Sequence, residues 1–170
     1  MSLQRIVSGG QTGVDRGALD ACLERGFPCG GWCPAGRAAE DGPIPATYPV
    51  RELPGGDYQA RTHRNVEDSD ATLIVYFHHP TGGTEKTLAH CIREQRPYRL
   101  VDASEVDAQR AAVLTTRFLA ERNVTVLNVA GPRQSEAGEA YAYGHRLVTR
   151  LLHAIDAARP QRPHPGGGEA

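Results

Sequence analysis

The sequence predicts a Rossmann-like, doubly wound α/β fold, with a mostly parallel sheet of about five or more strands and helices on both faces. Short apolar segments rich in β-branched residues alternate with longer segments of helical periodicity. Glycine-bearing turns follow three of the apolar segments, as they do at the strand-to-helix junctions of such folds. Strands that alternate with helices usually pair in parallel, because each helix returns the chain to the same end of the sheet.

The first half of the chain begins with an expected strand at 3–7 and a helix whose apolar face ends at Gly26. Residues 27–56 are rich in glycine and proline and show little periodicity, so we expect a long loop with at most a short strand near 48–53. A loop of this length in a compact domain is usually functional. A short helix is expected over 61–68.

The second half repeats the order of strand, glycine turn and helix. The apolar run 71–77 is typical of a strand covered on both faces, and Thr84 is expected to cap the next helix. The remaining expected elements are a strand at 98–101, a helix opened by a capping box at Ser104 and Asp107, a strand at 124–129 and a helix capped by Ser135. The helical residues expected to face inward are Leu88, Ala89 and Ile92, then Ala111, Leu114, Phe118 and Leu119, then Tyr141, Gly144, Val148, Leu151, Leu152 and Ile155.

Length and charge exclude several classes of protein. The 170 residues suit one domain, which we place at 1–158, followed by a disordered proline- and glycine-rich tail at 159–170. The net charge of -1 gives no general attraction to nucleic acid or to an anionic membrane. We find neither a membrane-spanning run nor a signal peptide, and therefore expect a cytoplasmic protein. The four cysteines fit no disulfide framework or paired zinc motif, so we expect free thiols and no metal site.

Three glycine-bearing turns are expected to meet at the carboxyl edge of the sheet. They are Gly9–Gly13, Gly82–Thr84 and 130–133. Glycine allows the backbone to approach a ligand closely, and the N–H groups at the start of the following helix favour phosphate or another oxyanion. One such turn is as often a plain strand-to-helix connection, but three on one edge favour a ligand site.

The candidate binding residues come from these turns and from the loop 27–56. They are Gly9, Gly10, Gln11, Thr12, Gly13, Asp15, Arg16, Trp32, Arg37, Gly82, Gly83, Thr84 and Arg133. Trp32 and Arg37 can flank a flat heterocycle or clamp a phosphate; alternatively, Trp32 packs on the sheet and Arg37 pairs with Glu40 or Asp41. Asp15 either caps the first helix or contacts a hydroxyl or amine of the ligand.

Further residues leave the chemistry open. Arg61, Thr62 and Arg64 add anion-binding capacity, but at this spacing they equally suit a solvated helix face. The first turn has neither the G-x-G-x-x-G spacing of a dinucleotide site nor the Gly-Lys-Ser/Thr end of a phosphate loop, which disfavours NAD binding and ATP hydrolysis. No nucleophile and base can be paired by spacing, so the catalytic residues stay unassigned.

Five segments together resemble the family named putative molybdenum carrier, over roughly residues 3–155. They are GGQTGVDRGALDA at 9–21, GGWCPAGRAAEDGPIP at 30–45, the run from Arg61 to Asp70 with ATLIVYF, GGTEKT at 82–87 and VLNVAGPR at 126–133. That family is similar to the molybdenum cofactor carrier proteins and to the wider Rossmann-like group that includes the lysine-decarboxylase-like (LOG) phosphoribohydrolases.

The resemblance implies a homo-oligomer, a dimer or tetramer, with a pocket for the molybdenum cofactor (molybdopterin), molybdate or a related phosphate-bearing ligand. Molybdoenzymes or cofactor-synthesis proteins would then be possible partners, with no nucleic acid or membrane involved. It places Gly9, Gly10, Thr12, Gly13, Gly82, Gly83 and Thr84 on the anion, with Trp32, Arg37 and Arg133 flanking it.

We therefore expect a non-enzymatic binding or carrier protein for an anionic ligand. One alternative is a nucleoside-monophosphate N-glycosidic hydrolase that uses Asp15, Glu40, Asp41 or Glu85 as acid or base. The phosphoribohydrolase relatives carry a P-G-G-x-G-T-x-x-E pattern, and Thr87 stands here in place of its glutamate, which argues against that chemistry. Another alternative is a nucleotide-sensing domain.

Overall fold

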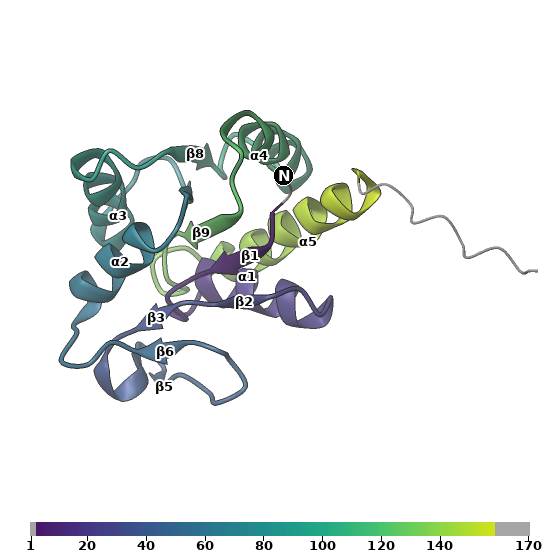
Figure 1. Ribbon diagram of the computed structural model, residues 1–170. Coiled ribbons are helices and arrows are strands. Elements are labelled where there is room, and N and C mark those ends of the chain that lie inside the picture. Colours follow the sequence, from purple (N-terminus) through teal and green to yellow (C-terminus); the bar gives the residue numbers. More distant parts are fainter. Residues whose placement is uncertain (1–2, 159–170) are drawn as a thin grey trace, which may run out of the picture.

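The computed structural model describes residues 3–158 and contains one five-stranded parallel sheet (Figure 1). Its strands, in the spatial order β2-β1-β9-β7-β8, are β1 (Arg5–Val7), β2 (Cys29–Gly30), β7 (Ala71–Tyr76), β8 (Tyr98–Asp102) and β9 (Val126–Ala130). Every pairing in this sheet is parallel. The predicted Rossmann-like α/β fold is confirmed.

Helices cover both faces of the sheet. One face carries α1 (Val14–Glu24), α4 (Ala108–Arg122) and α5 (Ala140–Ala158), and the other carries α2 (Tyr58–Glu67) and α3 (Gly82–Arg93) (Figure 1). The alternation within β7 follows from this: Leu73 and Val75 join the core under α1, α4 and α5, whereas Ile74 packs with Val66 of α2 and Cys91 of α3.

The order of the strands places a crevice at the centre of the sheet. From β1 the chain passes through α1 to β2 at one edge, and from β7 it passes through α3 to β8 at the other edge. β9 lies between β1 and β7. Because the two crossovers leave in opposite directions, the turns after β1, β7 and β9 border the position where doubly wound folds bind ligands.

The rest of the segment between α1 and α2, after β2, carries short strands and lies beside the main sheet (Figure 1). β3 (Trp32–Cys33) pairs with β6 (Arg51–Glu52), β4 (Ala38–Ala39) pairs with β5 (Gly42–Pro43), and a 3-10 turn spans Ala35–Arg37. The segment buries Cys33, Ile44 and Val50 against Leu19 of α1. The short strand expected near 48–53 corresponds to β6, whereas the other two-residue strands, β2, β3, β4 and β5, were not expected.

The expected inward face of α3 was right only for Leu88, which is half-buried against Val66, Ile74 and Cys91. Thr81, not Thr84, precedes the helix, and Thr84 lies in its first turn. The buried positions are Thr84, Thr87 and Cys91, whereas Ala89 is exposed and Ile92 is 57% exposed. Two of the three buried residues are threonines, so a pattern built on apolar residues selected the wrong stripe.

Two further caps and one side chain also differ from expectation. Asp107 alone caps α4 by accepting from the Arg110 N–H at 2.8 Å. Ser135 does not cap α5, which begins at Ala140, and its hydroxyl contacts Glu40 instead. Tyr141 is 38% exposed rather than inward, and its hydroxyl donates to Asp20. The other inward residues predicted for α5 are buried.

The remaining observations concern the C-terminal tail, the cysteines and membrane-spanning helices. The tail predicted at 159–170 lies outside the described residues. The four cysteines, at positions 22, 29, 33 and 91, are free thiols as expected. Within residues 3–158, no helix has the length and apolar character needed to cross a membrane.

Candidate functional site

The three glycine turns meet in one small pocket at the carboxyl edge of the sheet. Its lining comes from the β1 turn (Gly9, Gln11, Asp15), from α2 (Arg61, Thr62, Asn65), from the start of α3 (Gly83, Thr84, Thr87) and from β9 and the turn after it (128–131, Arg133, Glu136). The cavity volume is about 40 Å³. A single water needs about 10–15 Å³ on this measure, so the pocket has room for about three waters or a group of similar size, such as a small oxyanion, and is small for a whole heterocycle.

Three residues that line this pocket each carry a buried polar atom with no hydrogen-bond partner among the described residues. These atoms are Gln11 Nε2, Arg61 Nε and Thr84 Oγ1. Gln11 Oε1 accepts from the N–H groups of Thr12 and Glu40, each at 3.0 Å, which leaves its amino group free. A buried donor without an acceptor costs about 1–3 kcal/mol. Three of them around one pocket therefore indicate a site for an acceptor, such as an oxyanion.

Asp15 and Arg61 form a buried ion pair in the pocket wall. Arg61 Nη1 lies 3.4 Å from Asp15 Oδ2, and the two side chains are 13% and 6% exposed. The Gln11 N–H also donates to Asp15 Oδ2, at 3.2 Å. Burial raises the pKa of Asp15, while the charge of Arg61 opposes that rise. Asp15 thus neither caps α1 by a side-chain hydrogen bond nor is exposed to solvent.

Two glycines are required by close approach. A Cβ on Gly9 would lie 1.5 Å from Arg61 Nη1, so glycine at this position makes room for the guanidinium. Gly13 has a φ of 81°, and a Cβ there would lie 2.3 Å from the carbonyl oxygen of Pro132. The first turn can therefore touch the turn after β9 only because Gly13 has no side chain.

Arg133 supplies the second guanidinium of the pocket. It lies over the Tyr58 ring, 5.5 Å from the ring centroid, and 3.9 Å from Glu136. The start of α3 adds the partial positive charge of a helix N-terminus, which contributes about 0.3–1 kcal/mol toward an anion. The pocket thus combines two arginines and a helix end with the carboxylates of Asp15 and Glu136.

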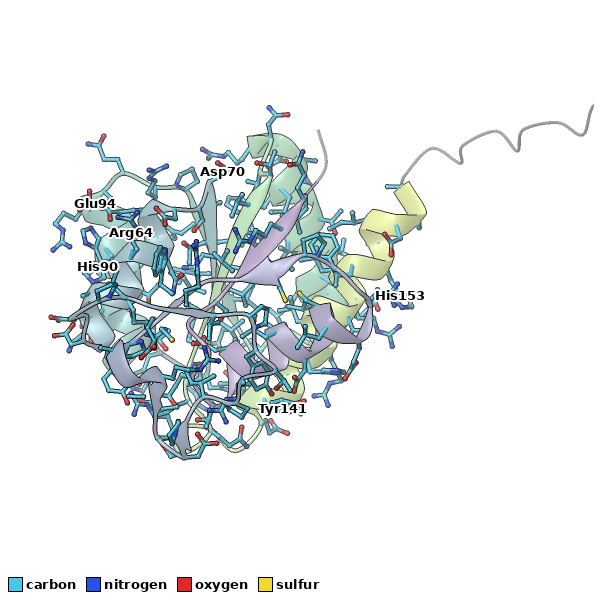
Figure 2. The ribbon with its side chains drawn as sticks, turned by 60° about the horizontal axis from the view of Figure 1, so that its bottom comes forward. Arg64, Asp70, His90, Glu94, Tyr141 and His153 are labelled. Carbon is cyan, nitrogen blue, oxygen red and sulfur yellow. The ribbon has the colours of Figure 1, made fainter. Side chains whose placement is uncertain are left out.

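Only part of the predicted set meets in this pocket. The predicted residues that line it are Gly9, Gln11, Asp15, Gly83, Thr84 and Arg133. Thr12, Gly13 and Arg16 instead line a wider, open hollow of about 650 Å³, together with Tyr141, which Figure 2 labels. There Arg16 pairs with Asp41, with one contact at 2.8 Å.

Glu40 links two of the segments that line the open hollow. It accepts hydrogen bonds from the Thr12 hydroxyl and from the backbone and side chain of Ser135. Burial is the largest single influence and raises the pKa of Glu40, but the hydrogen bonds from Ser135 and Thr12 together outweigh it, so the pKa is lowered. Glu40 therefore connects the first turn to the segment after β9, and the hollow is an independent feature beside the pocket.

Arg37 and Trp32 lie outside the pocket and hold the loop 27–56. The Arg37 guanidinium donates to the carbonyl oxygens of four residues at 2.8–3.0 Å: Ile44, Pro45, Tyr48 and Val50. Arg37 thus neither lines the ligand pocket nor pairs with Glu40 or Asp41, the alternative considered. Trp32 Nε1 donates to Asp68 at 2.8 Å, and the guanidinium carbons of Arg51 and Arg64 lie 4.8 and 5.5 Å from its ring centroid.

Gly10 and Gly82 also lie outside the pocket lining. Gly10 faces the loop core, where a Cβ would lie 3.1 Å from Ile44 Cδ1. At Gly82, a Cβ would lie 3.1 Å from Glu136 Oε1, so this glycine borders the pocket without lining it.

Several lining residues were absent from the predicted set. Asn65, Thr87, Asn128 and Glu136 were not considered, and Arg61 was left open as a solvated helix face. Asn128 carried a usable signal, because it interrupts the otherwise apolar strand β9 and is 3% exposed. Its amide donates to the Thr72 hydroxyl of β7 at 3.3 Å.

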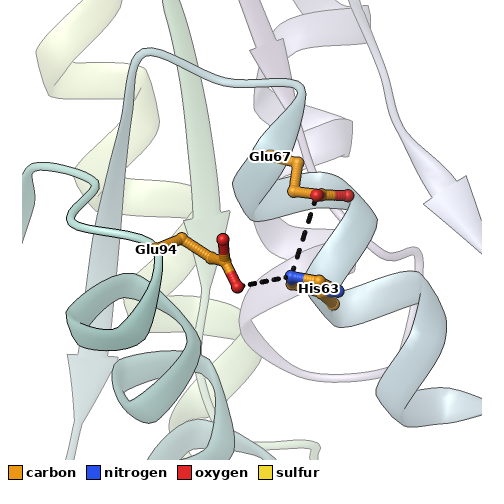
Figure 3. A group of neighbouring side chains, drawn as sticks. All are labelled: His63, Glu67 and Glu94. Atoms are coloured by element: carbon orange, nitrogen blue, oxygen red, sulfur yellow. Dashed lines mark hydrogen bonds and ion pairs between the residues drawn. The ribbon is translucent and has the colours of Figure 1, made fainter.

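A second cluster of titratable residues joins α2 to the end of α3. His63 Nε2 lies 3.1 Å from Glu94 Oε1 and 3.8 Å from Glu67 Oε1 (Figure 3). These three ligand atoms lie within 4.8 Å of one another and could hold a metal ion. The His63 ring stacks on His90, and Arg93 also contacts Glu94. The side chains thus partner one another, which explains the packing of α2 on α3 without a metal.

Comparison with known proteins gives the following matches. The model of the circularly permutated YpsA SLOG family matches residues 6–152. A crystal structure from Syntrophus aciditrophicus, of a protein named putative molybdenum carrier protein, is 38% identical, covers 89% of this chain and 96% of that chain, and has a TM-score of 0.86. A LacI family transcriptional regulator from Arthrobacter sp. FB24 is 13% identical over 94% of this chain and 73% of that chain, with a TM-score of 0.34. Curated proteins gave no match. The resemblance found in the five sequence segments is confirmed.

Proposed function

The chain belongs to the circularly permutated YpsA SLOG family, and from that membership and the pocket we propose a specific cargo for it. The family and the close structural relative support a binding or carrier role. We propose that the ligand is anionic and carries a phosphate, most concretely the molybdenum cofactor. The Syntrophus protein is named a molybdenum carrier, which supports a ligand that contains molybdenum. Free molybdate is the smaller candidate.

The three unpartnered atoms carry this proposal. Gln11 Nε2, Arg61 Nε and Thr84 Oγ1 are buried around a space that has room for a small oxyanion. All three can donate a hydrogen bond to an oxyanion. Because the space takes only the anionic group, the heterocycle of a larger ligand would lie outside the pocket.

The test compares variants of two arginines on the same helix. Arg61 lines the pocket, whereas Arg64 stacks on Trp32 and pairs with Asp68 outside it. A hydrogen bond with a charged partner contributes about 1.5–3 kcal/mol, so Arg61→Ala should weaken binding of inorganic phosphate roughly 10- to 150-fold. Arg64→Ala should leave it within about threefold. Isothermal titration calorimetry measures both affinities.

Cofactor binding is measured in parallel, as retention of purified molybdenum cofactor on the protein and its protection from oxidation. We expect retention by the protein and by Arg64→Ala, and loss with Arg61→Ala. Retention no better than that of a charge-matched control protein would reject the cofactor. Absence of phosphate binding as well would reject the anion site.

One observation favours a second function. The buried carboxyl of Asp15, whose pKa burial raises, lies in the anion pocket and is suited to donate a proton to a leaving group. A positioned general acid of this kind would assist departure of the base in a nucleoside-monophosphate N-glycosidic hydrolase. The test is to incubate the protein with a panel of nucleoside monophosphates. Release of free base that is lost with Asp15→Asn would support the hydrolase function. Release from none of them would reject it in favour of the carrier function.

The remaining expectations about assembly stay proposals. We propose a homo-oligomer, a dimer or tetramer, that passes its ligand to molybdoenzymes or cofactor-synthesis proteins in the cytoplasm. Sedimentation velocity tests the oligomer, and a monomer across micromolar concentrations would reject it.

A further inference from the structure

We propose that Asp15 determines the class of anion that the pocket accepts. The preferred ligand is an oxyanion that still carries a hydrogen to donate, such as hydrogen phosphate. A fully ionised tetrahedral dianion, such as sulfate or molybdate, is disfavoured. This inference rests on the proposed anion-binding function and narrows its ligand to a protonated or hydroxyl-bearing phosphate compound.

The first step is the position of the carboxylate. Asp15 lines the same small pocket as the three unpartnered atoms, and only 4% of the residue is exposed. The contacts from the Gln11 N–H at 3.2 Å and from Arg61 Nη1 at 3.4 Å both fall on Oδ2 and are long, and the Ser8 side chain also interacts with the carboxylate. An ionised carboxylate offers about four acceptor positions, so Asp15 retains acceptor capacity toward a ligand.

The second step is that the other charged groups do not discriminate. Arg61, Arg133 and Glu136 are the other charged side chains that line the pocket, and Arg16 lies close enough to interact electrostatically with Asp15. Hydrogen phosphate and sulfate both carry two negative charges and have the same tetrahedral shape. The charges of these groups therefore act on both anions alike, and the anions differ in the single hydrogen that only hydrogen phosphate carries. Glu136 is the other carboxylate, but it is 35% exposed, accepts from the Arg133 N–H at 3.1 Å and lies 3.9 Å from Arg133 Nε, whereas Asp15 is buried.

The third step is the contact between Asp15 and that hydrogen. Hydrogen phosphate can donate it to the carboxylate in a short, charge-assisted hydrogen bond. Sulfate and molybdate can only place an oxygen lone pair against the carboxylate. Sites built to accept a hydrogen bond reject analogues without the donor by up to about 10⁴-fold, and for this partly open pocket we expect roughly 10²-fold.

The ionisation of ligand and carboxylate sets the range of this preference. A phosphate monoester loses its last hydrogen near pH 6, so above that pH a bound ester needs a neighbouring hydroxyl or N–H to satisfy Asp15. Burial raises the pKa of Asp15, and Arg61 opposes the rise. Below that raised pKa, the neutral carboxyl becomes a donor, and sulfate should then bind as well as phosphate.

The experiment measures the affinity of the full-length protein for inorganic phosphate, sulfate and molybdate at pH 7.5 by calorimetry. We expect phosphate to bind about 10²-fold more tightly than either dianion. In Asp15→Asn, the amide can donate as well as accept, so the gap should close to within about threefold. Asp41→Asn removes an exposed carboxylate that pairs with Arg16 outside the pocket and should retain the preference.

The possible results distinguish a failure of this inference from a failure of the proposed anion-binding function. Equal binding of phosphate and sulfate by the unaltered protein overturns the role of Asp15 but leaves an anion-binding protein. Absence of binding by all three anions overturns both. A preference that survives in a folded Asp15→Asn, shown by an unchanged circular dichroism spectrum, assigns the selectivity elsewhere and also overturns the inference.

Discussion

Gly9→Ala tests the pocket without replacing any polar or charged residue. A Cβ at this position would lie 1.5 Å from Arg61 Nη1, 2.5 Å from Arg61 Cζ and 2.9 Å from Asp15 Oδ2. Gly9 is not among the residues with positive φ, so its backbone accommodates alanine. The clash is therefore with the guanidinium, which has to leave its place beside Asp15.

The expected magnitude follows from the contact that is lost. The nearest atoms belong to the far end of a flexible side chain, so the backbone need not move. Loss of a hydrogen bond between a charged donor and the ligand costs about 1.5–3 kcal/mol, which is roughly a 10- to 150-fold weaker affinity for phosphate. The free energy of unfolding should fall by about 1–3 kcal/mol, because the displaced guanidinium can regain water but the Asp15 carboxyl stays buried without its charged partner.

Calorimetric titration with inorganic phosphate and urea unfolding measure the two quantities on one preparation. Gly138→Ala is the matched control, since Gly138 is exposed, has no atom within 4 Å of a new Cβ and lacks positive φ. Its affinity and stability should stay close to those of the unaltered protein. A folded Gly9→Ala that binds phosphate normally would refute the assignment of Arg61 to the anion.

Two further predictions concern stability. Because burial raises the pKa of Asp15 in the folded state, its contribution to stability is present below the unfolded pKa near 3.9 and is lost as pH rises through the folded pKa. Urea unfolding from pH 3 to 8 should therefore show the stability difference moving in favour of Asp15→Asn as pH rises; a constant difference would contradict this. Arg37→Ala removes the donor to four loop carbonyls and should destabilise the protein by about 3 kcal/mol, with protease cleaving first within 38–50 and phosphate affinity unchanged. If Arg37→Ala is as stable as the unaltered protein, Arg37 does not stabilise the loop.

The location of the site could be predicted from the sequence because it depends on topology. Parallel strands joined by helices bring their carboxyl ends to one edge, so Gly9, Gly83 and Arg133 had to lie near one another once the strands were recognised. The structure of the loop 27–56 was harder to predict from the sequence. Its strands are only two residues long. Its conformation depends on the Arg37 guanidinium, which donates to four carbonyls of the same loop, and no periodic pattern reveals such contacts.

The role of Arg61 could not be predicted, since it depends on the rotation of a helix. Successive residues of a helix point about 100° apart, so a small rotation of α2 exchanges pocket-facing and solvent-facing positions. Arg61 lines the pocket, while Arg64, less than one turn later, stacks on Trp32. The sequence does not distinguish the two arginines, and the packing of α2 on α3 and on β3 separates their roles.

The residues that depart from the expected apolar pattern of the helices and strands lie in the pocket. The buried stripe of α3 contains Thr84 and Thr87 where apolar residues were expected, and β9 buries Asn128 in an apolar strand. All three line the pocket. A buried polar group is costly unless it is partnered, and Thr84 Oγ1 has no partner among the described residues. Such residues are retained at a cost to stability where a ligand uses them. The local departures from the helix and strand patterns thus support the same anion site as the glycine turns do.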